Sequence, residues 1–382
     1  MIKKIQHQEI IIEQKEIEAP RAKAFFKKYW KYALGIIVAL GLMTYLIVKS
    51  EPRLIWEGLV NANYVYILAA IGCMGVLFVI KTLRWQLVLR PHGYKIPFIQ
   101  ALRLILIGTF GSSVTPAKVG DVLRAFYLTK ERKDIKIGVS VFSVVFDRLL
   151  DLAGIFIIVG ITVPVAIIKI GFSSIDWWIP AAVGFGFLIF IGLIVVVFSG
   201  KISKPILNFL LKFIGKIFKK NEAKKKVEIT SQEIITDFYE NQKNYQWWHY
   251  IVLALLSVVF WILLGIQGSL LLQAFKIPIF DTVQGPLIVI AVLSVAAIAA
   301  MALPISISGI GVRDIIIMFF LELLLVSDNL TTEVINVAAI NLSILQTFMN
   351  VLLPGLIGGL LIIITNKTIK LPKKIKRKPI TA

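Results

Sequence analysis

Long apolar runs separated by short polar stretches dominate this 382-residue chain. An α-helix needs about 20 apolar residues, and at least about 17, to cross the hydrocarbon core of a bilayer. Six runs meet this length and predict complete membrane helices. They cover residues 32–48, 64–80, 139–165, 179–198, 250–275 and 334–365.

Two further apolar segments, 97–115 and 286–326, are interrupted or ended by Pro and Gly. In both interruptions an Arg follows a Gly by four residues, so the two breaks share one spacing. The positions are Pro116, Gly120 and Arg124 in the first break and Pro304, Gly309 and Arg313 in the second.

This spacing has a physical meaning in a membrane. Proline ends the incoming helix, and glycine lets the chain turn and a ligand approach closely. The next helix then begins inside the bilayer, where its free N–H groups and positive dipole end stabilise an anion such as phosphate. An Arg one turn later adds a planar donor pair suited to phosphate. Simple kinks would explain one break, but the repeat favours a binding site. The expected substrate-binding residues are Thr115, Lys118, Gly120, Arg124, Ser306, Ser308, Gly309, Gly311 and Arg313.

The span 139–165 carries Asp147, Arg148 and Asp151 near its start. Charged residues inside a membrane span are costly, and they usually face a protein interior or a wet cavity. Two interpretations stay open: a counter-charge or proton carrier that resets a transport site, and a structural ion pair to Arg124 or Arg313. The expected charge-balancing residues are Asp121, Asp147, Arg148, Asp151 and Asp314.

The formal net charge is +20, and the Lys and Arg residues flank the apolar runs. The positive-inside rule explains this pattern better than nucleic-acid binding does, because no folded module surrounds the basic runs. The rule places both termini in the cytosol, with an N-terminal segment 1–31 and a basic tail 367–382. Between them we expect one transmembrane domain, 32–366, with a cytosolic amphipathic insert at 201–249. That insert lies either on an anionic membrane surface or on the protein itself.

This orientation constrains the two broken segments. The first must enter from the cytosol and return there, and the second must enter from outside and return outside. The expected fold is therefore an all-α polytopic membrane protein with about six full spans and two oppositely oriented membrane-dipping hairpins, or up to eight spans if the hairpins cross. Opposed broken helices that meet near the midplane are typical of inverted-repeat transporters.

The amino-acid composition supports a membrane protein and points to no metal or disulfide chemistry. Hydrophobic residues make up 58% of the chain, against about 45–50% in soluble domains. The single cysteine excludes an intrachain disulfide, and the three histidines lie far apart. We therefore expect no metal, no cofactor and no catalytic residue.

Four stretches resemble the flippase-like family that includes the transmembrane region of lysylphosphatidylglycerol synthases. They read RWQLVL at 84–89, PAKVGDVLR at 116–124, DRLLDL at 147–152 and LPISISGIGVR at 303–313. This chain departs from the family where Asp147 replaces the usual Glu, where Ala117 and Lys118 replace Gly-Arg, and where Ser308 replaces a Gly. The full synthases carry a large soluble aminoacyl-transfer domain, and this chain ends in a short basic tail. The resemblance therefore implies that this chain corresponds to the membrane part of those synthases, which translocates lipid, and not to their aminoacyl-transfer domain.

The expected function is translocation of an anionic lipid, of phospholipid or polyprenyl-phosphate type, in the cell membrane. A non-transporting accessory of lipid or glycan synthesis is one alternative. A lipid-phosphate transferase with Asp147 or Asp151 as base is the other, although an enzyme is less expected. The expected partners are the anionic lipid and the membrane, with no nucleic acid. A synthesis enzyme and a second copy of the chain stay open as partners.

Overall fold

A computed structural model describes most of the chain, and its helices account for nearly all of the described residues. The described residues are 41, 44–45, 48, 52–115, 119–170, 184, 187–188, 191–192, 245–302, 309–326 and 330–368. Most of the expected spans 32–48 and 179–198, nearly all of the insert 201–249, and the positions Lys118, Ser306 and Ser308 lie outside them.

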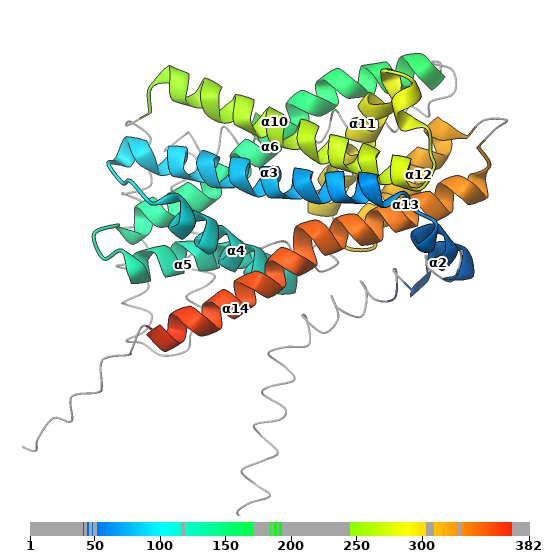
Figure 1. Cartoon of the computed structure of the whole chain (residues 1–382). Coiled ribbons are helices and arrows are strands. Elements are labelled where there is room, and N and C mark those ends of the chain that lie inside the picture. Colours follow the sequence, from blue (N-terminus) through cyan, green and yellow to red (C-terminus); the bar gives the residue numbers. More distant parts are fainter. Residues whose placement is uncertain are drawn as a thin grey trace, which may run out of the picture.

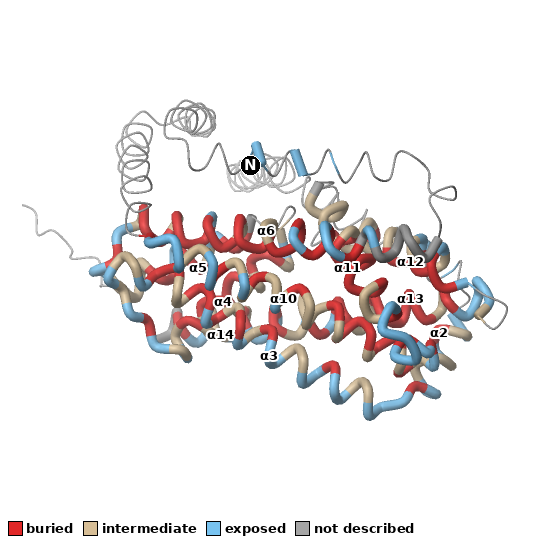
Figure 2. The backbone as a smooth tube through the Cα atoms, turned by 90° about the horizontal axis from the view of Figure 1, so that it is seen from above, coloured by how far each residue is buried: buried red, intermediate tan, exposed pale blue. Residues whose placement is uncertain are grey.

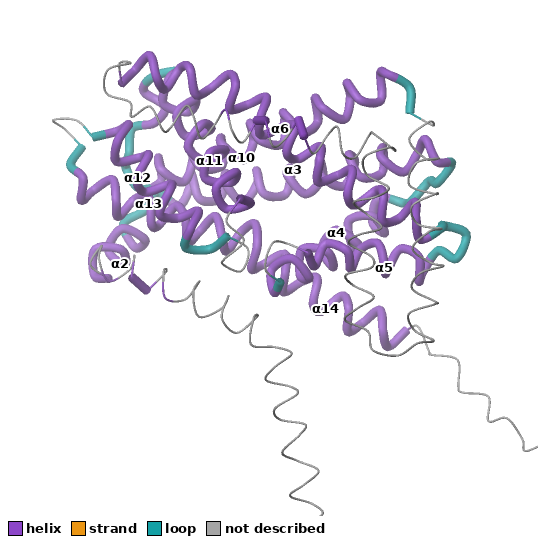
Figure 3. The backbone as a smooth tube through the Cα atoms, turned by 180° about the vertical axis from the view of Figure 1, so that it is seen from behind, coloured by secondary structure: helices purple, strands orange, loops and turns teal. Residues whose placement is uncertain are grey.

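The described part contains α-helices joined by short loops, and it has no β-strand (Figure 3). The helices are α2 (Pro52–Val60), α3 (Tyr64–Leu89), α4 (Phe98–Val114), α5 (Val122–Glu131), α6 (Ile137–Ile170), α10 (Trp247–Ala274), α11 (Gln284–Ala302), α12 (Val312–Leu325), α13 (Thr332–Thr347) and α14 (Leu353–Thr368).

Four of the described helical stretches are long and apolar enough to cross a membrane. They are Tyr64–His92, Trp247–Ala274, Gln284–Met301 and Thr332–Thr365. An all-helical membrane protein is thus confirmed, whereas the count of six spans with two membrane-dipping hairpins stays a prediction.

Small residues allow the central helices to pack closely. Helices α3 and α10 run side by side (Figure 1). Gly154 of α6 lies against Ser257 and Trp261 of α10, and Gly268 of α10 lies against Leu293 of α11. Glycine at such contacts lets helix backbones approach, as is common in membrane bundles. Buried residues are accordingly frequent along α6 and α11, as Figure 2 shows.

The first break joins α4 and α5 into an antiparallel pair. At the open end, Arg103 of α4 contacts Glu131 of α5 at 2.5 Å. At the closed end, Gly111 lies against Gly120, in a contact so close that a Cβ on either residue would overlap the other's backbone. The expected break after residue 115 is therefore present, and glycine is needed on both sides of it.

The second break joins α11 and α12, which pack against each other. Gly309 and Gly311 have φ angles of 77° and 89°, a region that favours glycine. The Gly311 N–H donates to Asp314 Oδ2 at 2.8 Å, so Asp314 caps the start of α12. A negative side chain there also complements the helix dipole.

The predicted end of the second span at Ile80 is wrong. Helix α3 continues to Leu89 and carries Lys81 and Arg84 into the bundle. The charged residues do not end the helix, because Arg84 finds buried carboxylate partners on α6. The segment between the first two predicted spans also contains a helix, α2, whose Ile55 carbonyl oxygen accepts a hydrogen bond from Asn341 Nδ2.

The last span is continuous, with a π-helical segment at Phe348–Leu352 between α13 and α14. The Leu353 N–H donates to the carbonyl oxygen of Phe348, five residues earlier. Pro354 has no N–H to donate to the preceding turn. The wider turn thus lies where Pro354 interrupts the regular hydrogen-bond pattern.

Candidate functional site

A buried ion network joins α3, α5 and α6. Asp147 lies at its centre, with Arg84 Nη2 2.7 Å from Oδ1 and Arg124 Nη2 2.7 Å from Oδ2. Arg84 Nη2 also contacts Asp151 Oδ1 at 2.5 Å. Asp147 and Asp151 share one face of α6 because they are four residues apart. Both oxygens of Asp147 are thus held by arginines from other helices.

Neighbouring side chains complete this network. Arg84 Nη1 donates to Ser257 Oγ at 3.0 Å. The Arg124 guanidinium lies 5.2 Å from the centre of the Trp85 ring, whose Nε1 donates to Ser143 Oγ at 3.1 Å. Buried ions are tolerated when their charges are paired and most of their hydrogen bonds are made. Arg84 and Arg124, each 1% exposed, therefore clamp α3 and α5 to α6.

A second part of the network ties the first break to α6. Arg148 Nη1 donates to Asp151 Oδ2 at 3.1 Å, and its Nη2 forms an ion pair with Asp121. Ser112 of α4 donates to Asp121 Oδ1 at 2.9 Å. Asp121 thus connects the turn of the first break to the charged face of α6.

The second break has its own ion pair. Arg313 donates to Asp314 Oδ1 from Nε at 3.0 Å and from Nη2 at 2.8 Å. Its Nη2 also donates to Thr347 of α13, and Ser343 donates to Asp314. These contacts fix the start of α12 against α13.

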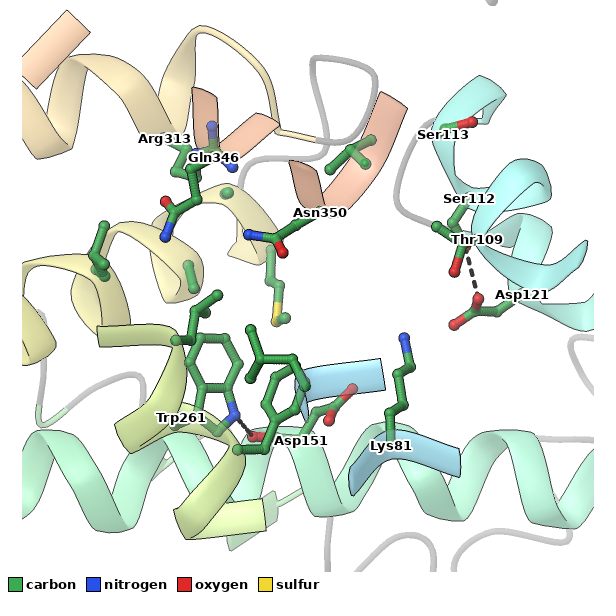
Figure 4. A pocket seen from close by; sticks show the side chains of 18 of the residues that line it. Lys81, Thr109, Ser112, Ser113, Asp121, Asp151, Trp261, Arg313, Gln346 and Asn350 are labelled. Carbon is green, nitrogen blue, oxygen red and sulfur yellow. Dashed lines mark hydrogen bonds between the residues drawn. The ribbon is translucent and has the colours of Figure 1, made fainter. Parts of the chain in front are cut away.

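A cavity of about 180 Å³ lies between the two breaks, and residues from both line it (Figure 4). Asp121, Arg148 and Asp151 contribute from the first network, and Arg313 contributes from the second. Its apolar lining includes Phe78, Phe260, Trp261, Leu264, Leu293, Ala297, Ala300 and Met301. A cavity with apolar walls and a few convergent polar groups is the usual form of a small-ligand site.

Lys81 of α3 extends its amino group into this cavity (Figure 4). Four arginines and four aspartates surround the cavity or lie behind it, and every arginine pairs with at least one aspartate. Among the described residues, Lys81 makes neither an ion pair nor a hydrogen bond, so it is the one cation left over from this pairing. The cavity therefore holds one lysine amino group that none of the described carboxylates pairs with.

The structure brings several predicted residues together and places others elsewhere. Arg124 and Asp147 lie behind the cavity wall, each almost fully buried. Thr115 bridges the two sides of the first break. Its hydroxyl accepts a hydrogen bond from the Gly120 N–H and donates one to the Gly111 carbonyl oxygen, both at 2.8 Å. Arg148 and Asp151 form the local pair that their spacing suggests, at 3.1 Å.

Sequence reasoning missed Lys81, Arg84 and Gln346 as site residues. The sequence does contain a sign that Lys81 and Arg84 lie on the helix. No Pro or Gly occurs between Ile80 and Pro91, so nothing there ends the helix before these two residues. Gln346 carried no such signal, since an amide in a span usually bonds to another helix.

Comparison with known proteins places this architecture in a family. Residues 32–361 match the lysylphosphatidylglycerol synthase TM region. A UPF0104 membrane protein of Methanocaldococcus jannaschii is 28% identical over 206 residues, which cover 53% of this chain and 59% of that protein. A second, of Archaeoglobus fulgidus, is 26% identical over 43% of this chain and 46% of its own length.

The chain thus spans about half the length of these two curated relatives. A third UPF0104 membrane protein, of Pyrococcus horikoshii, is 22% identical over 363 residues, or 89% of this chain and 98% of that protein. The family match covers most of the chain, including both breaks and the charged face of α6. This protein is therefore a membrane protein that belongs to the family of the lysylphosphatidylglycerol synthase transmembrane region.

Proposed function

We propose that this protein translocates a lipid with an anionic head group across the membrane, as a flippase-like carrier. The head group binds in the cavity between the two breaks, and the acyl chains stay outside it. The lining of the cavity supports this division. The polar side chains gathered in its wall suit a head group, whereas acyl chains need only apolar surroundings.

The position of Lys81 is the observation that carries the proposal: its amino group lies in the cavity and has no ion-pair partner among the described residues. An unpaired cation at membrane depth is costly, and such residues usually mark a substrate pathway. The arginines around the cavity are already paired, so they hold the framework in this conformation. An anionic head group would supply the negatively charged partner that Lys81 lacks among the described residues.

The contacts favour binding over the transferase alternative. A general base needs a carboxylate oxygen free to take a proton. Both oxygens of Asp147 are paired with arginines, and those of Asp151 contact Arg84 and Arg148. Neither carboxylate has the freedom that a base requires.

Transport by the purified full chain in liposomes tests the proposal. The liposomes contain a phospholipid with an acyl-chain NBD label and an unmodified anionic or zwitterionic head group, and dithionite bleaches the label in the outer leaflet. We expect the protein to expose inner-leaflet anionic lipid well above the rate in empty liposomes, with the zwitterionic lipid moving more slowly. Rates equal to those in empty liposomes, both with and without a proton or sodium gradient, would contradict the proposal.

A further inference from the structure

The described cations around the cavity are of two chemical kinds. Four of them are arginines, each paired with an aspartate: Arg84, Arg124, Arg148 and Arg313. A guanidinium stays protonated at every pH that a folded protein meets. The remaining side chain is that of Lys81, which extends an amine into the cavity (Figure 4), and an amine can release its proton and bind it again. Among the described basic residues there, Lys81 alone can therefore change its charge.

The two carboxylates that line the cavity are already engaged. Asp121 of the first break forms an ion pair with Arg148. Asp151 of α6 contacts both Arg148 and Arg84. Helices α4, α10, α11 and α13 contribute only uncharged side chains to the wall. Within the described part of the chain, the Lys81 amine thus lies among charged groups that pair with one another and not with it.

The described charges around the cavity balance when Lys81 is neutral. The four arginines are then matched by four aspartates: Asp121, Asp147, Asp151 and Asp314. A protonated Lys81 in the empty cavity would add a charge without a partner to a largely apolar surrounding, which is unfavourable. An anion bound beside the protonated amine restores the balance. The empty and the loaded cavity both avoid a net charge if the proton arrives and leaves with the anion.

We infer that Lys81 binds a proton together with each anion and releases it with that anion, so that the two cross the membrane as a neutral pair. On loading, the amine lone pair takes a proton from water on one side and becomes an ammonium beside the anion. On release, the ammonium returns the proton to water on the other side, and no other bond changes. This inference rests on the proposed function and adds its energy source, which is a proton gradient.

Lipid transport across a pH gradient tests the inference. The full chain is placed in liposomes with acyl-chain NBD-labelled phosphatidylglycerol, a probe whose phosphodiester lacks the second ionisation that a monoester shows at about pH 6. An acidic interior should speed movement from the inner to the outer leaflet, by up to about tenfold per pH unit for one proton per lipid. A membrane potential set with potassium and valinomycin, without a pH gradient, should leave the rate unchanged because a neutral pair carries no charge across.

Lys81→Arg separates the proton from the anion. Arginine keeps the positive charge that binds the anion, but it does not release its proton. We expect this variant to bind phosphatidylglycerol within about tenfold of the parent, by native mass spectrometry, because the charge is retained. Its transport rate should no longer respond to the pH gradient. The exposed-site control Lys133→Gln should respond as the parent does.

Proton uptake by the parent protein gives a readout that needs no variant. Short-chain phosphatidylglycerol added to the full chain in weakly buffered detergent, with a pH-sensitive dye, should withdraw up to about one proton per bound lipid from solution, as linkage between the two ligands requires. Binding of the same lipid should weaken as the pH rises, because the anion then has to recruit a scarcer proton.

The outcomes separate this inference from the proposed function. Transport that depends on Lys81 but proceeds at one rate in every pH gradient would overturn the inference and leave an anionic-lipid carrier intact. A gradient response that persists in Lys81→Arg would do the same, since the proton would then be carried elsewhere. Lipid binding by the parent without proton uptake would also overturn it. Absence of lipid transport by the parent would contradict the proposed function, and the inference would fall with it.

Discussion

At the scale of single residues, the described cations around the cavity are four paired arginines and one lysine, Lys81, without an ion-pair partner. The sequence identified Arg124, Asp147 and Asp151 as a charged group, because charges in an apolar run are rare. It did not reveal that Arg84 shares their pairing, since a partner 63 residues away in the chain is set by tertiary packing. An ion pair from this group to Arg124 was one of the two interpretations left open, and Arg124 does contact Asp147. No local pattern indicated that Arg124 also lies over the Trp85 ring.

Loss of Arg124 should destabilise the protein. Arg124→Gln removes one partner of the buried Asp147 carboxylate, and breaking a buried pair costs about 3–5 kcal/mol. We expect a lower melting temperature in detergent, and partial recovery in the double variant with Asp147→Asn. Arg53→Gln is the control, because the Arg53–Glu57 pair is exposed and contributes little. A melting temperature for Arg124→Gln equal to that of the control would contradict the claim that Arg124 holds α5 against α6.

Loss of Lys81 should have the opposite effect on stability. Lys81→Gln removes a charge that has no ion-pair partner among the described residues, so no carboxylate is left uncompensated. We expect a melting temperature equal to or above that of the parent, measured in the same detergent. A drop as large as that of Arg124→Gln would mean that Lys81 belongs to the structural network.

At the scale of elements, both breaks were predictable and one helix end was not. The Pro and Gly spacing placed the ends of α4 and α11 correctly, because these residues act through local backbone geometry. The end of α3 depended on distant carboxylates, which local patterns do not record. The π-helical segment before Pro354 was likewise not predicted, because Pro354 alone does not show whether the helix before it bends or widens.

The contact between Gly111 and Gly120 holds the first break closed. A Cβ at Gly120 would overlap the Gly111 backbone, so Gly120→Ala must push α4 and the turn apart. Overpacking of this kind costs about 1–3 kcal/mol. We expect a lower melting temperature and weaker binding of anionic lipid. Gly75→Ala, at a helical position with open space around it, is the matched control and should melt no earlier than the parent.

At the scale of the whole molecule, the sequence predicted the class of protein better than its topology. Apolar content and run length are sufficient for an all-helical membrane protein. The number of spans and the sides on which hairpins enter depend on the position of the bilayer. Among the described residues, four helices are long and apolar enough to cross it.

The positive-inside rule predicts the orientation of the chain from its Lys and Arg distribution. With a cytosolic insert at 201–249, a cysteine introduced at position 220 in a Cys73→Ala background should react with an impermeant maleimide only after the cells are opened. Labelling at this position in intact cells would contradict the predicted topology, because it would place the insert outside the cell.

The most direct test of the central claim is lipid transport by Lys81 variants in liposomes, at matched protein content and with phosphatidylglycerol that carries an acyl-chain label. Lys81→Gln should slow transport roughly ten- to a hundredfold, since a hydrogen bond to a charged group contributes about 1.5–3 kcal/mol. Lys81→Arg should retain part of the rate, and Lys133→Gln should retain all of it. Transport by Lys81→Gln at the full rate of the parent would contradict the account.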